Sequence, residues 1–487
     1  MTQALTAPPL PKRLALYYGG KWHEPAGGYR PTFNPATGEI LAQAPEANAE
    51  DIAAAAEAAH QGFLAWSRLP AAERGARLRE IARRVRDHAD ELAHLDAANC
   101  GNPIQRMRPD ALNAAAQIDY YAGLVHELKG ETIPTADRGL NYSMREPLGV
   151  VARIVAYNHP LMFLAGKMAP VLAAGNSVIM KAPDQAPLSA LRFAEIIDGI
   201  LPPGTLNIVT GGSDCGEALV LHPTVRKVAL IGSAGTGAAI LRNAADKIMP
   251  VTLELGGKNP LVVCPDADLE TAVQGAINGM NFTWAGQSCG STSRLFVHDS
   301  LYDAVLERLC AQLPKLHRCG LPTDPATTMG CLISEAQFDK VMSYIQLGIS
   351  EDARLVAGGK RPDDPALAKG WFIEPTVFAD VTPAMRIFRE EIFGPVLSVI
   401  RWSDEDQLIA DVNSVDYGLS ASIYTRDLAR AHRLAQRIEA GYIWINTSSA
   451  HYLGANFGGY KKSGLGREEG LEEPLSYTQV KNVHVAL

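Results

Sequence analysis

Apolar residues with helical spacing dominate the chain after a Pro- and Gly-rich start. Over residues 49–69 the apolar positions recur every three or four residues, which predicts an amphipathic helix. Asn48, with Asp51 three positions later, predicts the N-cap of that helix. The same spacing predicts a second long helix that ends at Gly101 and a third helix over 110–124.

The pattern then changes to short apolar runs that alternate with helical stretches. Strands are predicted at 149–157, 177–181, 205–210 and 227–231, with helices at 189–200, 215–221 and 235–247 between them. This alternation is typical of a parallel sheet covered on both faces, so a dinucleotide-type α/β domain is predicted up to about residue 255.

The alternation begins again after Gly257 and predicts a second α/β domain. Its helices are expected at 269–282, 301–313 and 334–348, and its strands at 294–297, 354–357, 396–400, 420–424 and 442–445. The closing stretch 476–485 reads as a strand with no hairpin partner beside it. Since such a strand has an unpaired edge, we expect it to pair with another region of the chain or with another subunit.

Composition narrows the functional classes. The chain has 487 residues, 45 Lys+Arg against 53 Asp+Glu and 47% hydrophobic residues, which favours a folded globular protein and excludes disorder. Net acidity without basic runs argues against nucleic acid or an anionic membrane as a partner. The most apolar stretch, 161–180, is interrupted by Lys167 and Pro170 and predicts no transmembrane helix.

The seven cysteines are scattered, odd in number and include no CxxC pair. This spacing suits neither a disulfide framework nor a zinc site, so no metal site is indicated and a cytoplasmic location is expected. No signal peptide is recognised at the N-terminus, which has no long apolar core.

Three segments are candidates for chemistry, and each has a structural alternative. Cys289 stands among small residues, as an accessible nucleophile would, but taken alone this pattern favours a buried structural thiol. Glu254, flanked by leucines at a strand end, could be a desolvated base or an ion-pair partner. The glycine-rich turn 232–237 could meet a pyrophosphate or simply connect a strand to a helix, and it lacks the GxGxxG spacing.

Taken together, these segments are more specific. The chain resembles the NAD(P)-dependent aldehyde dehydrogenase superfamily through seven motifs that follow the family order over nearly the whole length. They are Tyr157-Asn-His-Pro160, Lys181-Ala-Pro-Asp-Gln-Ala-Pro187, the turn Gly232–Gly237, Glu254-Leu-Gly-Gly-Lys-Asn-Pro260, Gly286-Gln-Ser-Cys289 with Arg294, Glu391-Ile-Phe-Gly-Pro395 and Asn456-Phe-Gly-Gly-Tyr-Lys-Lys-Ser-Gly464.

The resemblance implies a catalytic set. Cys289 would attack the aldehyde carbonyl to give a thiohemiacetal, and hydride transfer to the nicotinamide would leave a thioester. The Asn158 amide and the Cys289 backbone N–H would stabilise the oxyanion. Glu254 would activate the water that hydrolyses the thioester.

The resemblance also implies NAD as the cofactor. Asp184 stands where relatives often have Glu, and an acid there favours the free 2′-hydroxyl of NAD, so NADP is the less favoured alternative. Lys181 and Glu391 would hold ribose hydroxyls. The remaining implied cofactor residues are Gly232, Ser233, Gly237, Tyr157, Phe393 and Leu255.

The substrate pocket departs from the family pattern. Phe163, Trp284, His451 and Phe457 are expected to line it, although aromatic residues more often form core. His159 sits where an aromatic residue is frequent, and Gly166 replaces a bulky aromatic residue, which predicts room for an aromatic or branched aldehyde. Arg153 and Arg294 are expected to be structural ion-pair partners.

The implied architecture is an α/β fold with two open parallel-sheet domains and a small β oligomerisation element. Residues 1–123 and 145–256 would bind NAD, residues 257–455 would form the catalytic domain, and residues 124–144 with 456–487 would form the oligomerisation element. That element would give the closing strand a partner across a homodimer, with a homotetramer equally open. The alternatives are an acylating dehydrogenase that transfers the thioester to coenzyme A and a non-catalytic scaffold of the same fold.

Overall fold

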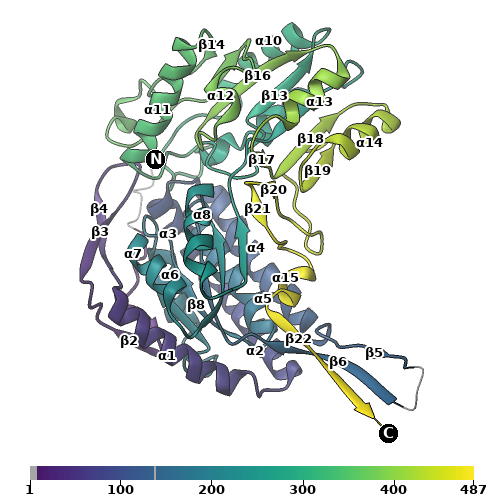
Figure 1. Cartoon of the computed structure of the whole chain (residues 1–487). Coiled ribbons are helices and arrows are strands. Elements are labelled where there is room, and N and C mark those ends of the chain that lie inside the picture. Colours follow the sequence, from purple (N-terminus) through teal and green to yellow (C-terminus); the bar gives the residue numbers. More distant parts are fainter. Residues whose placement is uncertain (1–7, 136–138, 487) are drawn as a thin grey trace.

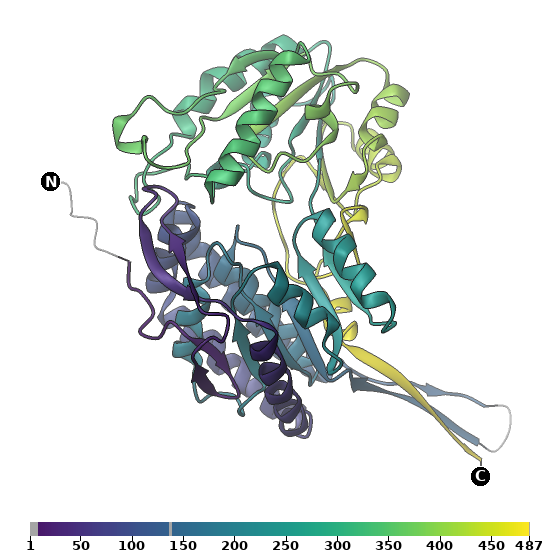
Figure 2. The same cartoon turned by 60° about the vertical axis from the view of Figure 1, so that its left-hand side comes forward.

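The computed structural model describes residues 8–135 and 139–486 of the chain (Figure 1). It contains an eight-stranded and a seven-stranded sheet, both mainly parallel and flanked by helices, with smaller antiparallel sheets beside them. Figure 2 shows the two large units one above the other, with a thin β arm leaving the lower unit. The α/β fold with two open, mainly parallel sheets that the sequence predicts is therefore confirmed.

The first sheet is built around a parallel centre. Its strands, in spatial order, are β2 (Lys21–His23), β1 (Leu16–Tyr18), β9 (Leu206–Val209), β8 (Ser177–Lys181), β7 (Val150–Ile154), β10 (Val225–Ile231), β11 (Val251–Glu254) and β21 (Gly464–Leu465). The five strands from β9 to β11 are parallel, whereas β2, β1 and β21 join antiparallel. Chain order reverses between β7 and β10, and such a switch point opens a crevice at the carboxyl ends of the strands.

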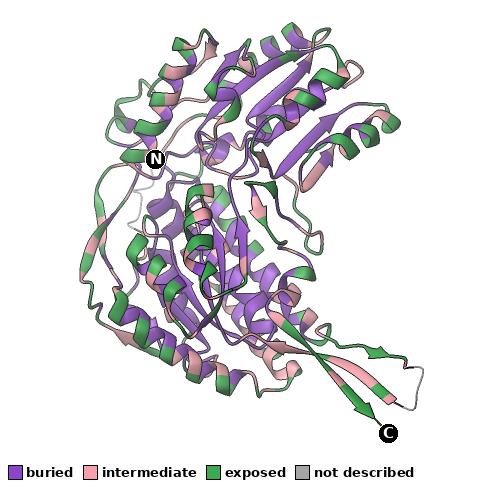
Figure 3. Ribbon diagram, viewed as in Figure 1, coloured by how far each residue is buried: buried purple, intermediate pink, exposed green. Residues whose placement is uncertain are grey.

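Both faces of this sheet are covered, because alternate residues of each strand belong to different cores. Val151 packs with α2, α4, α5 and α6, whereas Val150 and Ala152 pack with the opposite face under α1, α7 and α8. The helices are α1 (Ala49–Trp66), α2 (Ala71–Asp87), α3 (Ala89–Cys100), α4 (Ile104–Gly123), α5 (Lys167–Ala173), α6 (Leu188–Ile197), α7 (Ser213–Leu221) and α8 (Ala234–Ala245). In Figure 3 the strands of both large sheets are mostly buried.

The second sheet has the strand order β14 (Arg354–Ala357), β15 (Thr376–Ala379), β16 (Val396–Trp402), β13 (Arg294–His298), β12 (Pro260–Val263), β18 (Ser420–Tyr424) and β19 (Tyr442–Ile445). All its pairings are parallel except β14 with β15. Its helices are α9 (Leu269–Gly279), α10 (Tyr302–Leu316), α11 (Glu335–Ser350), α12 (Arg386–Arg389), α13 (Glu405–Asn413) and α14 (Leu428–Arg437).

The β arm consists of β5 (Thr132–Ile133), β6 (Gly139–Pro147) and β22 (Thr478–Ala486). The closing strand β22 pairs antiparallel with β6 of the same chain along its whole length. Of the two partners expected for this strand, another region of the chain is therefore confirmed, and pairing across a dimer stays a prediction that concerns its other edge. The remaining short elements are β3 (Tyr29–Phe33), β4 (Ile40–Pro45), β17 (Tyr417–Gly418), β20 (Tyr460–Lys461) and α15 (Glu472–Leu475).

The structure tests two details of the predicted helices, the N-cap at Asn48 and the extent of the second helix. The capping box is confirmed, since Asn48 Oδ1 accepts from the Asp51 N–H and Asp51 Oδ2 accepts from the Asn48 N–H. The second predicted helix is instead two helices, α2 and α3, because the backbone leaves helical geometry at His88 (φ −110°, ψ 14°). Gly101 ends α3 in a left-handed conformation (φ 86°), as the sequence predicts.

A buried ion cluster fixes the C-terminal segment to the first sheet. Arg153 of β7 is fully buried and forms ion pairs with Glu468 and with Glu473 of α15. Lys167 Nζ at the start of α5 lies 2.9 Å from Glu468 Oε2. The expected ion-pair role of Arg153 is confirmed. That of Arg294 is wrong, because its guanidinium donates to three backbone carbonyls, those of Lys258, Asp411 and Val412.

Replacing Arg153 by Met should lower the free energy of unfolding by about 3–5 kcal/mol, since two buried carboxylates lose a partner. The matched control is Arg354→Met, which removes an exposed ion pair to Asp380 and should cost about 0–1 kcal/mol. Urea unfolding followed by tryptophan fluorescence measures both variants. Equal losses in the two would contradict a structural role for the cluster.

Candidate active site

The carboxyl ends of the central strands bring several predicted residues to one edge of the first sheet. Ile154 at the end of β7 is paired with Lys181 of β8, and Ile231 at the end of β10 is paired with Glu254 of β11. Lys181 and Glu254 therefore share this edge, three strands apart, or about 14 Å in the hydrogen-bonding direction. This edge is the crevice that the chain-order reversal predicts.

The segment that carries Cys289 is held by hydrogen bonds to side-chain amides. Asn259 Nδ2 donates to the Cys289 carbonyl at 2.7 Å and to the Ser291 carbonyl at 3.0 Å. Gln287 donates to the Cys331 carbonyl and accepts from the Ile333 N–H. Both side-chain amides are buried. They therefore hold the backbone of the Cys289 segment in place and are not themselves available to bind a ligand.

One cavity of 310 Å³ joins the candidate nucleophile to the candidate base. Cys289 and Glu254 both line it. The four predicted substrate residues also line it, namely Phe163, Trp284, His451 and Phe457. Tyr452, next to His451, is instead 66% exposed. The structure thus brings together a thiol, a carboxylate and an aromatic wall from segments far apart in the sequence.

Burial sets the electrostatics of this pair. It raises the pKa of the Glu254 carboxyl well above its usual value, and the nearby Glu468 charge adds to the effect. Glu254 Oε1 has no hydrogen-bond partner among the described residues, so it is available to a water molecule or a substrate. A carboxyl group with a raised pKa is suited to general-base chemistry near neutral pH.

The Cys289 thiol does not have the lowered pKa that a nucleophile is expected to have. Burial, followed by the negative charges of Glu254 and Glu391, raises its pKa to about 12. The thiol is therefore protonated at neutral pH in the chain without ligands. Its activation requires a proton acceptor, and Glu254 lies on the wall of the same cavity.

Asn158 lies beside this cavity. Its side chain is buried, and its backbone carbonyl accepts from Asn102 Nδ2 at 2.8 Å. Its neighbour His159 lines the cavity, whereas Asn158 is not among the residues that do. The structure therefore fixes the Asn158 backbone next to the site.

The glycine turn after β10 leads into the exposed first turn of α8. Ser233 is the N-cap and its Oγ accepts from the Thr236 N–H at 3.2 Å, while Gly235 leaves its side of the turn open. Free N–H groups at a helix N-terminus suit a phosphate. Gly237 is buried below, where a Cβ would approach Leu255 Cδ1 to 2.9 Å, so these two residues serve helix packing.

Lys181 and Asp184 differ in how their charges are used. The Lys181 side chain is buried, and no hydrogen bond or ion pair to its ammonium is found within 8–135 and 139–486. Asp184 is half-buried and its Oδ2 lies 3.0 Å from Arg30 Nη2, while Arg30 Nε also lies 3.2 Å from Glu46 Oε2. A cofactor hydroxyl group that binds the Asp184 carboxylate would therefore share it with Arg30.

Glu391 and Phe393 reach the site from the second sheet. Glu391 Oε1 accepts from the Gly257 N–H at 3.0 Å, and a Cβ on Gly256 would lie 2.1 Å from Glu391 Oε2. Phe393 has a left-handed backbone (φ 56°), which a bulky residue rarely adopts. Its ring meets that of Tyr157 edge-on, with the centroids 6.0 Å apart.

Sequence reasoning missed several residues of this site. Asp110 and Gln117 line the cavity from α4, and Lys167 and Glu468 reach it from the ion cluster. For Asp110 and Gln117, the only signal in the sequence was their spacing, which places both on one face of a helix. No sequence signal indicated Lys167 or Glu468. The predicted room at Gly166 is wrong, because a Cβ there would lie 2.2 Å from Gln117 Oε1.

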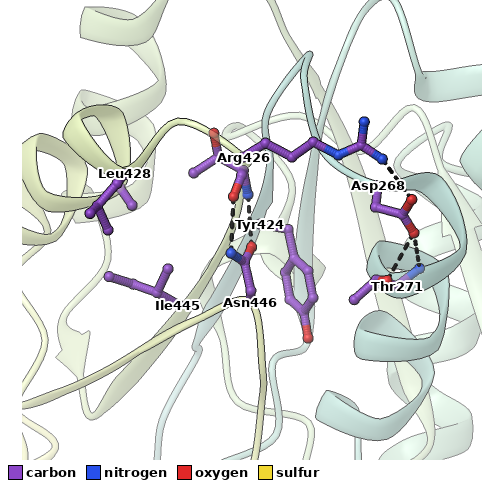
Figure 4. A pocket seen from close by; sticks show the side chains of 9 residues that line it. Asp268, Thr271, Tyr424, Arg426, Leu428, Ile445 and Asn446 are labelled. Carbon is purple, nitrogen blue, oxygen red and sulfur yellow. Dashed lines mark hydrogen bonds and ion pairs between the residues drawn. The ribbon is translucent and has the colours of Figure 1, made fainter.

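A second, larger cavity of 410 Å³ lies beside β18 and β19 (Figure 4). Arg426 Nη2 donates to Asp268 Oδ2 at 2.8 Å, and Asn446 exchanges two hydrogen bonds with the Thr425 backbone. No cysteine or histidine is among the residues lining this cavity in the described part of the chain. Its size therefore does not make it the chemical site.

Within the described ranges, no group of three or more His, Cys, Asp or Glu residues is arranged to hold a metal ion. None of the helices formed by those residues is both long enough and apolar enough to cross a membrane.

Comparison with known proteins identifies the family. The family model described as "Aldehyde dehydrogenase family" matches residues 22–483. The chain belongs to this family. It is 50% identical to the aldehyde dehydrogenase tropH of Talaromyces stipitatus over 485 residues, which cover 98% of this chain and 94% of that protein. The resemblance proposed from the seven motifs is therefore confirmed.

Solved structures match almost the whole chain. The NAD⁺ complex of aldehyde dehydrogenase from Bacillus cereus has a TM-score of 0.94 at 38% identity and covers 97% of this chain and 96% of that chain. PnpE from Pseudomonas sp. WBC-3, in complex with nicotinamide adenine dinucleotide, has a TM-score of 0.94 at 41% identity and covers 97% of each chain.

The raised thiol pKa predicts how Cys289 reacts in the ligand-free protein. Because only the thiolate is alkylated, the rate of iodoacetamide labelling at Cys289 should rise about tenfold per pH unit from pH 7 to 10 without levelling. Peptide-resolved mass spectrometry separates Cys289 from the other six cysteines. The exposed thiol of glutathione is the control and should level near pH 9. A plateau at Cys289 below pH 8 would contradict the assignment.

Proposed function

We propose that this aldehyde dehydrogenase oxidises an aldehyde to the carboxylic acid with NAD as the oxidant. The observation that supports the proposal is the shared 310 Å³ cavity, in which a buried carboxylate and a nucleophilic thiol are wall residues. The cavity meets the sheet edge where the exposed first turn of α8 begins. The NAD⁺ complex of the Bacillus cereus relative supports the choice of cofactor.

The side chains present fit NAD. The open first turn of α8 at Gly232 and Ser233 suits the pyrophosphate, and the unpaired Lys181 ammonium and the Glu391 carboxylate suit ribose hydroxyls. When bound, NAD accepts the hydride released from the substrate carbon. Tyr157 and Phe393 would wall the nicotinamide end, while Gly237 and Leu255 keep α8 close to the sheet.

The chain's own residues would perform the remaining chemistry. Cys289 Sγ bonds to the aldehyde carbon as its proton passes to Glu254, directly or through water, and this gives a thiohemiacetal. The Asn158 side-chain amide and the Cys289 backbone N–H stabilise the oxyanion. After oxidation to the thioester, Glu254 releases its first proton to solvent and then takes a proton from water as the water oxygen attacks the carbonyl carbon. The acid leaves as the C–S bond breaks, and the Cys289 sulfur recovers a proton from Glu254.

In this proposal the three predicted regions have separate tasks. Residues 1–123 and 145–256 hold NAD, and residues 257–455 supply the nucleophile. Residues 124–144 and 456–487 join subunits into a homodimer or homotetramer. The exposed strand β22, at the outer edge of the β arm, gives that contact an unpaired edge.

Replacing Glu254 by Gln should leave acylation possible but remove the base that activates water. We expect kcat to fall about 10²–10⁴-fold and intact-protein mass spectrometry to show an acyl adduct on Cys289. Cys289→Ser is the companion variant and should show neither turnover nor adduct. An undiminished steady-state rate in Glu254→Gln would contradict the role of Glu254.

One assay of turnover distinguishes the proposed hydrolytic reaction from the acylating reaction and from a non-catalytic scaffold. NADH formation is followed at 340 nm against a panel of aldehydes, with and without coenzyme A. Turnover with NAD alone supports hydrolysis, whereas turnover only with coenzyme A indicates the acylating reaction. Absence of turnover, together with Cys289 labelling that neither NAD nor aldehyde alters, would indicate a scaffold without chemistry.

Removing the Asp184 charge should weaken the preference for NAD over NADP. A carboxylate near the 2′ position repels a phosphate, so Asp184→Asn should raise the NADP/NAD ratio of kcat/KM about tenfold or more. Dissociation constants from tryptophan fluorescence give a second readout without turnover. Asp363→Asn, which removes an exposed ion pair to Lys360, is the control and should leave the ratio unchanged. An unaltered ratio in Asp184→Asn would contradict the role.

A further inference from the structure

The substrate cavity contains a histidine–carboxylate pair that the proposed reaction does not use. His159 Nδ1 lies 2.6 Å from Asp110 Oδ2, and their side chains are 14% and 8% exposed. His159 follows β7 at the point where Asn158 is held, and Asp110 belongs to α4. Both residues line the cavity with Cys289.

Asp110 fixes the way in which His159 can act. A carboxylate only accepts hydrogen bonds, so Nδ1 carries a proton and Nε2 is left for another partner. Nδ1 is the only ring nitrogen of His159 with a hydrogen bond inside the described ranges. The Nε2 atom of an imidazole can pair with a hydroxyl group in two ways. A neutral ring accepts from the O–H group, and a charged ring donates to the oxygen atom.

Trp284 adds a second unpaired donor. Its ring centroid lies 5.4 Å from that of His159, and the Arg106 guanidinium carbon lies 5.9 Å from the Trp284 centroid. Trp284 Nε1 is buried and has no partner within the described part of the chain. A buried donor without a partner costs about 1–3 kcal/mol, and an oxygen on the substrate would satisfy it once the indole ring turns Nε1 toward the cavity.

The shape of the cavity favours a flat substrate. Aromatic side chains contribute much of its wall, and the His159 ring also contacts Phe163 with a centroid distance of 5.1 Å. Gln117 occupies the space that Gly166 leaves free, so no side pocket opens for a branched chain. Asp110, Asn113 and Gln117 form one polar stripe along α4, and Asp110 joins it to this aromatic wall through His159.

The charges argue against an ionic substrate. Lys167 is paired with Glu468, and His451 Nδ1 lies 3.0 Å from Glu469 Oε2, so neither side chain is free for a second carboxylate on the substrate. The carboxylates are also engaged, since Asp110 is paired with His159 and Glu468 with Lys167, and Glu254 is the base of the proposed reaction. Among the described wall residues, no ion is therefore left to pair with a charged group on the substrate.

We propose that the physiological substrate is an aromatic aldehyde with a ring hydroxyl group, which His159 Nε2 binds with Trp284 Nε1 as a second donor. Asp110 is a positioning residue that holds the imidazole in the required tautomer. This proposal rests on the proposed function, because it names the substrate of the same cavity.

The test compares kcat/KM for 2-, 3- and 4-hydroxybenzaldehyde with kcat/KM for benzaldehyde. The wild type should prefer at least one hydroxylated isomer, and His159→Phe should lower that preference about tenfold or more, since a hydrogen bond is lost while the ring is kept. Asp110→Asn should lower it less. The matched control is His451→Phe, another histidine of the same cavity, which should change both substrates alike.

A merely structural role of the His159–Asp110 pair would lower both activities together and leave the preference unchanged, which would overturn the proposal. A wild-type preference for an amino- or carboxyl-substituted benzaldehyde over every hydroxylated isomer would also overturn it. Calorimetry of the wild type with 4-, 3- and 2-hydroxybenzamide against benzamide needs no turnover. Tighter binding of a hydroxylated amide would support the inference even if no aldehyde were oxidised, and equal binding of all four would overturn it while leaving the dehydrogenase function standing.

Discussion

The geometry of the site depends on the two adjacent glycines that link the last parallel strand of the first sheet to the second sheet. A Cβ on Gly256 would collide with the Glu391 carboxylate, and a Cβ on Gly257 would lie 2.7 Å from the Cys289 carbonyl oxygen. The absence of side chains lets the Glu254 and Glu391 carboxylates and the Cys289 segment, the candidate base, cofactor ligand and nucleophile, converge from both sheets. Asn259, two residues later, then fixes the nucleophile segment.

The buried ion cluster shapes the opposite side of the same cavity. Arg153 and Lys167 neutralise Glu468 and Glu473, so the C-terminal segment can pass beneath the site without placing uncompensated charge there. Burial of such groups is expensive, and their mutual pairing offsets that cost only while all partners are present. The cluster also surrounds Glu254 with fixed charges, which connects the fold of the C-terminus to the protonation of the candidate base.

Patterns that depend on neighbouring residues could be predicted from the sequence. The Asn48 capping box, the left-handed Gly101 and the alternation around β7 to β11 all follow from local rules. The break between α2 and α3 at His88 could not be predicted, because the apolar spacing continues through this residue. Tertiary packing decides where the first of the two helices ends. The Asp110–His159 pair joins residues 49 positions apart without a motif, and the filling of Gly166 by Gln117 depends on a side chain from another helix.

The high pKa of the half-buried Cys289 thiol has a consequence for the lifetime of the protein. Peroxides and other electrophiles attack thiolates far faster than thiols, and oxidation beyond sulfenic acid is irreversible for most proteins. A nucleophile that stays protonated between turnovers is chemically inert toward such oxidants. The same desolvation that makes the sulfur of this candidate nucleophile harder to activate would therefore also slow its oxidation between turnovers.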